Sequence, residues 1–205
     1  MSYEFVPGAS AHHKMAAELI FDSAEDMCLF LFHSRDQTLR SLRRLCRHPD
    51  GHFGYELTTI AVSDDRPCGL VLGYDAETYR AQQFWGSLWM LFATPPSLWW
   101  HLAARVGQVV DRYLPEIEAD VYYISNFAIA EGQRGKGLGK MLLAYVLAKA
   151  RSKGFKRCQL DVSEKKTRAR TFYKREGMVE LFATDHRDLR EKFNLPNLVR
   201  MSIAL

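Results

Sequence analysis

The segment from Arg134 to Lys140 reads Arg-Gly-Lys-Gly-Leu-Gly-Lys and lies between a strand-like run and a helix-like run. A glycine loop that opens a helix exposes backbone N–H groups at the positive end of the helix dipole, where phosphate oxygens can accept several hydrogen bonds together. A Cβ would block that approach, which is why the loop needs glycine. The amides of residues 135–140 and the cationic side chains of Arg134, Lys136 and Lys140 are therefore predicted to hold a phosphate group.

Spacing separates this loop from other glycine-rich motifs. A Walker P-loop would need glycine in place of Arg134 and serine or threonine in place of Met141. A dinucleotide fingerprint that begins at Gly137 lacks its third glycine, although Asp161 lies at roughly the distance of the ribose-binding acid. Residues 132–135 match the G-x-x-G of a KH module, but a strand precedes them where that module has a helix. These three alternatives fit poorly.

Two motifs that follow one another along the chain carry a resemblance to a known family. Residues 134–139 match R/Q-x-x-G-x-G/A, and residues 169–178 match A-x-x-[L/F]-Y-x-x-x-G-[F/M]. With both motifs in this order, the chain resembles the GNAT N-acetyltransferase superfamily from about Tyr122 to Val179, and elsewhere only in topology. The resemblance implies the GNAT-type acyl-CoA N-acyltransferase fold, with acetyl-CoA as the donor substrate and no metal.

The resemblance also implies which residues contact the donor. In the family the glycine loop holds the pyrophosphate, and the central strand splays so that its backbone pairs with pantetheine. The residues at matching positions are Phe127, Ala128, Ile129, Arg134, Gly135, Lys136, Gly137, Leu138, Gly139, Lys140, Lys166 and Tyr173. Lys166 departs from the family pattern because an Asn that contacts pantetheine is common there. A lysine at this position could meet a phosphate instead.

Acetyl transfer needs a polarised thioester carbonyl, a neutral amine and a proton for the departing thiolate. The backbone amide of Ile129 is the candidate donor to the carbonyl oxygen. Resemblance places Tyr173 at the CoA sulfur, where a phenol, protonated near neutral pH, can act as the general acid. The alternative role for Tyr173 is packing. The general base stays open among Asp120, Glu131, Asp161 and a chain of water molecules.

Composition narrows the class of protein. The chain has 205 residues, is 47% hydrophobic and 25% charged, and carries a formal net charge of +4. These values are typical of a folded domain, and we expect a single one over residues 1–205. The charge is too small for a dedicated nucleic-acid binder but suits a polyanionic ligand. Four cysteines without C-x-x-C spacing indicate neither a zinc site nor disulfides, and the N-terminus lacks a secretory signal, so a cytoplasmic protein is expected.

The hydrophobic pattern predicts an α/β (α+β) fold with a mixed, mostly antiparallel central sheet and flanking helices. Thr167 is expected to cap the helix that carries Tyr173, and Gly154 to end the helix that follows the glycine loop. The cofactor-binding core spans about 120–180. The strand-like runs are 3–6, 55–62, 67–74, 122–129, 158–162, 178–183 and 198–205.

A Trp-rich helical insertion is expected at about 76–114. Within it, residues 81–104 hold all four tryptophans and no Asp, Glu, Lys or Arg, and Pro95-Pro96 divides them into halves too short to cross a bilayer. Two buried helices that meet at this turn are expected, with no membrane partner. The segment 84–100 could serve as core, as the wall of an acceptor pocket or as a homodimer surface, and core is favoured.

The expected function is transfer of acetyl from acetyl-CoA to a primary amine of a small molecule or peptide. Direct attack in a ternary complex follows because no Cys or Ser is placed as an acyl carrier. Two alternatives remain, a non-catalytic acyl-CoA sensor and a nucleotide-binding oxidoreductase. The pattern leaves the acceptor and the oligomeric state open.

Overall fold

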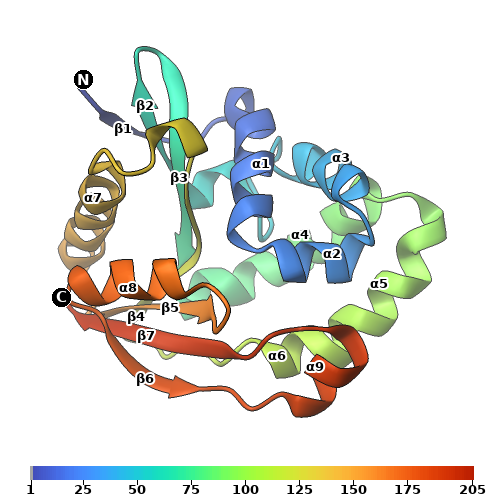
Figure 1. Cartoon of the computed structure of the whole chain (residues 1–205). Coiled ribbons are helices and arrows are strands. Elements are labelled where there is room, and N and C mark those ends of the chain that lie inside the picture. Colours follow the sequence, from blue (N-terminus) through green and yellow to red (C-terminus); the bar gives the residue numbers. More distant parts are fainter. Residues whose placement is uncertain (1) are drawn as a thin grey trace.

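A seven-stranded mixed sheet organises the computed structural model, in the order β1-β2-β3-β4-β5-β7-β6 (Figure 1). The structure describes residues 2–205, apart from the side chains at 107, 108 and 111, so Met1 of the expected 1–205 domain lies outside the described residues. Neighbouring strands are antiparallel except β4 and β5, which confirms the predicted mixed sheet. The strands are β1 (Glu4–Pro7), β2 (Thr58–Ser63), β3 (Arg66–Tyr74), β4 (Val121–Ile129), β5 (Arg157–Ser163), β6 (Val179–Ala183) and β7 (Leu198–Ala204).

Helices cover both faces of the sheet (Figure 1). Side chains alternate along β3, so Leu70 and Leu72 join one hydrophobic cluster and Val71 joins the other. The cluster around Val71 packs α7 and α8, and the larger one packs the remaining helices. These are α1 (His13–Ser23), α2 (Glu25–Phe32), α3 (Arg35–Leu45), α4 (Ala76–Ala93), α5 (Trp99–Arg105), α6 (Asp111–Tyr113), α7 (Leu138–Ser152), α8 (Thr167–Arg175) and α9 (Arg187–Phe193). All four cysteines are buried and unpaired.

Strands β4 and β5 pair over only half of their length. Their register runs from Val121 opposite Arg157 to Ile124 opposite Leu160, and then the two strands part. Just after that point Ser125 is an extra residue in β4 opposite β3, a bulge that bends the strand. Residues 125–129 therefore keep β3 on one side and have no strand on the other. This is the splay that the family resemblance implies.

The glycine loop and the ends of α7 have the conformations that their sequence predicts, whereas the start of α8 does not. Gly137 is the N-cap of α7 at φ +82°, and Gly135 has φ +77°, a left-handed backbone that glycine adopts at little cost. Gly154 at φ +86° follows α7, as expected of a helix stop. The prediction that Thr167 caps α8 is wrong, because Lys166 occupies the N-cap and no side chain caps the helix.

The Trp-rich segment forms two helices on either side of Pro95, α4 and α5, but the prediction that they are buried is wrong. Among the described side chains of α4 only Gly86 and Ala93 are buried, and Trp100 of α5 is 88% exposed. Some apolar residues of these two helices pack against the core, and the others lie on a large exposed face. Among residues 2–205, no helix combines the length and hydrophobicity that crossing a bilayer requires.

Candidate active site

A cavity of about 1250 Å³ opens where β4 and β5 part and is also lined by the glycine loop and α8. The two sequence motifs meet at this cavity. The residues predicted to hold the donor that line it are Phe127, Ala128, Ile129, Arg134, Gly135, Gly137, Gly139, Lys140, Lys166 and Tyr173. This is the one place in the described chain where a strand with a free edge faces the glycine loop.

Two predicted residues, Lys136 and Leu138, do not line the cavity. The first turn of α7 rotates the Leu138 side chain into the hydrophobic cluster beneath the helix, where it is fully buried. The Lys136 ammonium lies 3.4 Å from the side-chain oxygen of Gln133. Leu138 can therefore serve a ligand only through its backbone N–H group, whereas the Lys136 side chain is exposed beside the loop.

The loop offers unpaired N–H groups. No side chain caps α7, and the first backbone bond into the helix runs from the Met141 N–H to the Gly137 carbonyl. Within the described part of the chain, the N–H groups of residues 135–140 meet no acceptor. A Cβ built on Gly135 or Gly137 would meet no atom within 4 Å, so the space in front of the loop is open. The loop therefore fits a diphosphate, which needs several donors at the start of a helix.

The free edge of β4 exposes alternate residues. In an antiparallel pair the backbone groups of successive residues point alternately toward and away from the partner strand. The Ala130 N–H donates to the Cys68 carbonyl of β3, which turns Ala128 toward β3 as well. The N–H and C=O groups of Phe127 and Ile129 therefore point toward the cavity. Ala128 lines the cavity through its side chain and not, as predicted, through a free backbone.

Arg134 ties the loop to two other elements. Its Nε donates to the Ile129 carbonyl at 2.9 Å, and its guanidinium lies 3.6 Å from the Asp22 carboxylate at the end of α1. The side chain is 55% exposed, so its charge remains accessible from solvent. Because Arg134 occupies the Ile129 carbonyl, Ile129 presents its N–H as the free group.

Tyr173 projects from α8 into the buried end of the cavity and is only 7% exposed. Phe127 meets its ring edge-on, with 6.0 Å between centroids, and Phe172 lies 5.2 Å away. Burial raises the pKa of the Tyr173 phenol above its ordinary value. The hydroxyl therefore keeps its proton throughout the neutral range, and burial also makes that proton harder to release than the proton of an exposed phenol.

Lys166 has a different partner from the one expected. Its ammonium donates to the carbonyls of Asp22 at 2.9 Å and Ser23 at 2.7 Å, at the C-terminal end of α1. A cation at this end of a helix satisfies free carbonyls and complements the dipole. Burial lowers the pKa of Lys166. The side chain lines the cavity, but its charge fastens α8 to α1 and is not left free for a phosphate.

The sequence model described as the acetyltransferase (GNAT) family matches residues 17–178. The chain belongs to the GNAT acetyltransferase family. The resemblance carried by the two motifs is thereby confirmed, and this acetyltransferase is an acyltransferase by family. No curated protein matches the chain in sequence.

Solved structures share the fold of this acetyltransferase at low identity. An N-acetyltransferase from Staphylococcus aureus Mu50 superposes with a TM-score of 0.76 at 17% identity, over 98% of this chain and 100% of that one. A GNAT family acetyltransferase from Elizabethkingia anophelis with acetyl-CoA bound gives 0.57 at 14%, over 99% and 98%. The PaiA N-acetyltransferase from Thermoplasma acidophilum in complex with coenzyme A gives 0.57 at 14%, over 100% of both chains. At these identities the likeness shows the fold.

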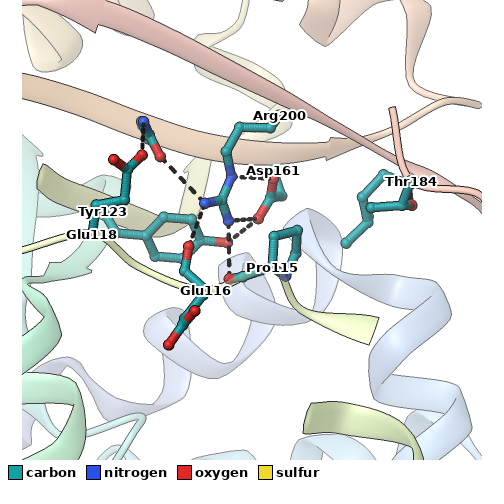
Figure 2. A network of polar contacts seen from close by, with 9 residues as sticks. Pro115, Glu116, Glu118, Tyr123, Asp161, Thr184 and Arg200 are labelled. Carbon is teal, nitrogen blue, oxygen red and sulfur yellow. Dashed lines mark hydrogen bonds and ion pairs between the residues drawn. The ribbon is translucent and has the colours of Figure 1, made fainter. Parts of the chain in front are cut away.

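Asp161, one of the acids proposed as general base, is committed to a buried network (Figure 2). Its carboxylate accepts from the Arg200 guanidinium at 2.9 and 2.6 Å and from the Tyr123 hydroxyl at 2.9 Å. Arg200 also donates to the carbonyls of Pro115 and Glu116. Asp161 and Arg200 lie opposite each other on β5 and β7, and both side chains are 3% exposed. Sequence reasoning missed Arg200, because only the folded sheet shows that its strand lies opposite the strand of Asp161.

The other two proposed acids lie outside the cavity lining. Asp120 precedes β4 and accepts from Arg157 at 2.7 Å, a hydrogen bond that lowers the pKa of its carboxyl. Glu131 is exposed in the short helical turn before the loop. Neither residue of this acetyltransferase is positioned to take a proton from an amine in the cavity.

A second cavity, of about 440 Å³, adjoins the first. The two share lining residues at the bulge of β4, at the end of β5 and at the end of α1, namely Ser23, Ser125, Asp161, Ser163 and Lys166. None of the four tryptophans lines either cavity, so the expectation that tryptophan walls an acceptor pocket has no support here. The α4 residues that do line the second cavity are Tyr79, Gln83, Ser87 and Met90.

Proposed function

We propose that this protein transfers the acetyl group of acetyl-CoA to a primary amine of a small molecule or peptide. One observation carries the proposal. Three groups suited to this reaction converge on one cavity: the unpaired loop amides, the Ile129 N–H at the free edge of β4, and the Tyr173 phenol. A binding module for acyl-CoA would need the loop and the sheet edge, but it has no need of the phenol of Tyr173 in the same cavity.

The donor would be held by backbone groups. The N–H groups of residues 135–140 suit the diphosphate, while Arg134 and Lys140 add positive charge. The backbone groups of Phe127 suit an amide of the pantetheine arm, because they point to the side of β4 that has no strand neighbour. When bound there, acetyl-CoA supplies an activated thioester.

Two groups of this chain would then serve the transfer. The Ile129 N–H would donate to the thioester carbonyl oxygen as the amine nitrogen bonds to its carbon, a contact worth about 3 kcal/mol of barrier. As the carbon–sulfur bond breaks, the Tyr173 hydroxyl would give its proton to the leaving sulfur. The surplus proton on nitrogen goes to water, since Asp120 and Asp161 are each held by an arginine. The phenol recovers its proton from solvent.

The buried cysteines support direct attack of the amine in a ternary complex, because they are poorly suited to carry the acetyl group. Cys28 lines the second cavity, but burial raises the pKa of its thiol to about 12. Burial raises the pKa of Cys158, deep in the core, to about 12 as well. A thiol that stays protonated at neutral pH is a poor acyl carrier.

Calorimetry with acetyl-CoA and with NADH, followed by release of free thiol with a panel of amines, tests this function. We expect saturable heat with acetyl-CoA, none with NADH, and thiol release only when an amine is present. Binding without turnover on any amine class would favour the acyl-CoA sensor. Heat with NADH and none with acetyl-CoA would favour the oxidoreductase and overturn the proposal.

A further inference from the structure

We infer that the second cavity receives the acceptor, and that this acceptor is a primary amine on an aromatic body with no carboxylate. The inference rests on the proposed function and adds the substrate class. The cavity adjoins the donor cavity at Ser125 and Asp161, beside the free edge of β4. An amine held by its ring in this cavity can therefore extend its nitrogen into the donor cavity beside the bulge of β4.

A row of aromatic rings forms one wall of the second cavity. His52 and Tyr79 have ring centroids 5.1 Å apart, Tyr79 and Tyr74 are stacked at 5.4 Å, and Tyr74 lies 5.9 Å from Tyr123. All four residues line the cavity. Aromatic rings favour offset or edge-on contact with a further ring, so this wall is suited to a flat aromatic ligand.

Helix α4 closes the cavity with one face only. Tyr79, Gln83, Ser87 and Met90 recur every three or four residues, so they lie along one side of the helix. The opposite side carries Phe92, which is 68% exposed. The inward side has no charged residue, and Met90 offers a flexible apolar contact. The helix thus covers the cavity with an apolar and weakly polar surface, which suits a hydrocarbon body and offers little to a polyamine or a sugar.

The charges around the cavity select a cation. Asp26 and Glu25, at the start of α2, line it and form no ion pair within the described chain. Asp161 is neutralised by Arg200. Lys166 is the only Lys or Arg among the described lining residues, and its ammonium is held by two carbonyls. Asp26 and Glu25 together outweigh the single Lys166 ammonium, so the lining keeps a net negative charge. This charge attracts an ammonium group and repels a carboxylate, which disfavours free amino acids.

Matched amines test the substrate class. 2-Phenylethylamine and phenylalanine share a ring and an amine and differ by a carboxylate, while spermidine has the amines without the ring. With acetyl-CoA as donor we expect kcat/KM for 2-phenylethylamine to exceed that of either competitor by about tenfold or more, a range that pocket contacts can supply. Equal or higher kcat/KM with spermidine or phenylalanine would overturn the inference and leave the proposed function intact.

Binding measured directly separates the two claims. Calorimetry of 2-phenylethylamine with the full chain should show saturable binding that Met90→Trp removes by filling the cavity, while Phe92→Ala on the far side of α4 leaves it unchanged. Asp26→Asn should weaken the same binding if Met90→Trp fails to fold. Binding that survives Met90→Trp and Asp26→Asn in folded protein would overturn the inference. Absence of acetyl-CoA binding would instead overturn the proposed function, and the acceptor role with it.

Discussion

The cavity proposed for the donor and the cavity proposed for the acceptor, here the donor cavity and the acceptor cavity, are adjacent but are built in different ways. The donor cavity is made by short stretches in which the sequence dictates the geometry, such as two glycines with positive φ followed by a helix. The acceptor cavity is assembled from side chains far apart in the sequence, from Ile20 to Leu198, and none of them belongs to a motif. A short sequence motif can thus specify the binding of the donor. The choice of acceptor instead depends on how helices that are distant in the sequence pack together.

The largest expected effect is at Arg200, which forms an ion pair with Asp161, a residue that lines both cavities. Arg200→Met would leave the Asp161 carboxylate buried without its cation and should lower the free energy of unfolding by about 3 kcal/mol or more. Urea unfolding followed by circular dichroism measures it. Arg112→Met is the matched control, because its ion pair with Asp188 is exposed and should matter by less than about 1 kcal/mol. Equal losses in both variants would show that the buried pair does not hold β5 and β7 together.

The next effect concerns chemistry in the donor cavity. Tyr173→Phe keeps the ring and removes the acid, so kcat should fall about 100-fold while the Kd for CoA stays the same. Steady-state kinetics and calorimetry give the two numbers. Tyr145→Phe, on the exposed side of α7, is the control. A variant that keeps the full kcat would assign Tyr173 to packing.

Because a local loop conformation forms the donor cavity, a substitution in the glycine loop should weaken donor binding specifically, with a smaller effect than that of Tyr173→Phe. Gly137→Ala places a Cβ on a residue with φ +82°, which costs about 1–2 kcal/mol, so the Kd for acetyl-CoA should rise about tenfold. Gly132→Ala, which has equally open surroundings, should leave it unchanged. If both variants bind alike, the loop conformation does not carry donor affinity.

The smallest effect is expected on the outer face of the acceptor side. Trp100 is 88% exposed, so Trp100→Ala should change stability by no more than about 0.5 kcal/mol and leave acceptor kinetics alone. Thermal unfolding and kcat/KM report both, and size-exclusion chromatography of the two proteins reports their association state. A dimer that dissociates on substitution would show instead that this face is an interface between copies.

The contrast between local motifs and long-range packing also explains which features the sequence could predict. The glycine loop, the strand before it and the helix with Tyr173 follow from local propensity and spacing, and the structure has them. Thr167 was a reasonable cap, but Lys166 takes the N-cap position and reaches the carbonyls of α1, a long-range contact. The exposure of α4 and α5 was also mispredicted, because an apolar segment does not reveal which side faces the core. Arg200 belongs to a strand whose partner is set only by the folded sheet.

After its bulge, β4 has a neighbouring strand on one side only. A ligand that binds along the free side must offer hydrogen-bonding groups spaced like those of a peptide. Such an edge selects a ligand by the spacing of the amide groups along its extended arm, independently of the thioester. Acetyl phosphate, which carries the same acyl group without those amides, should therefore be ignored by this protein at concentrations at which acetyl-CoA is turned over.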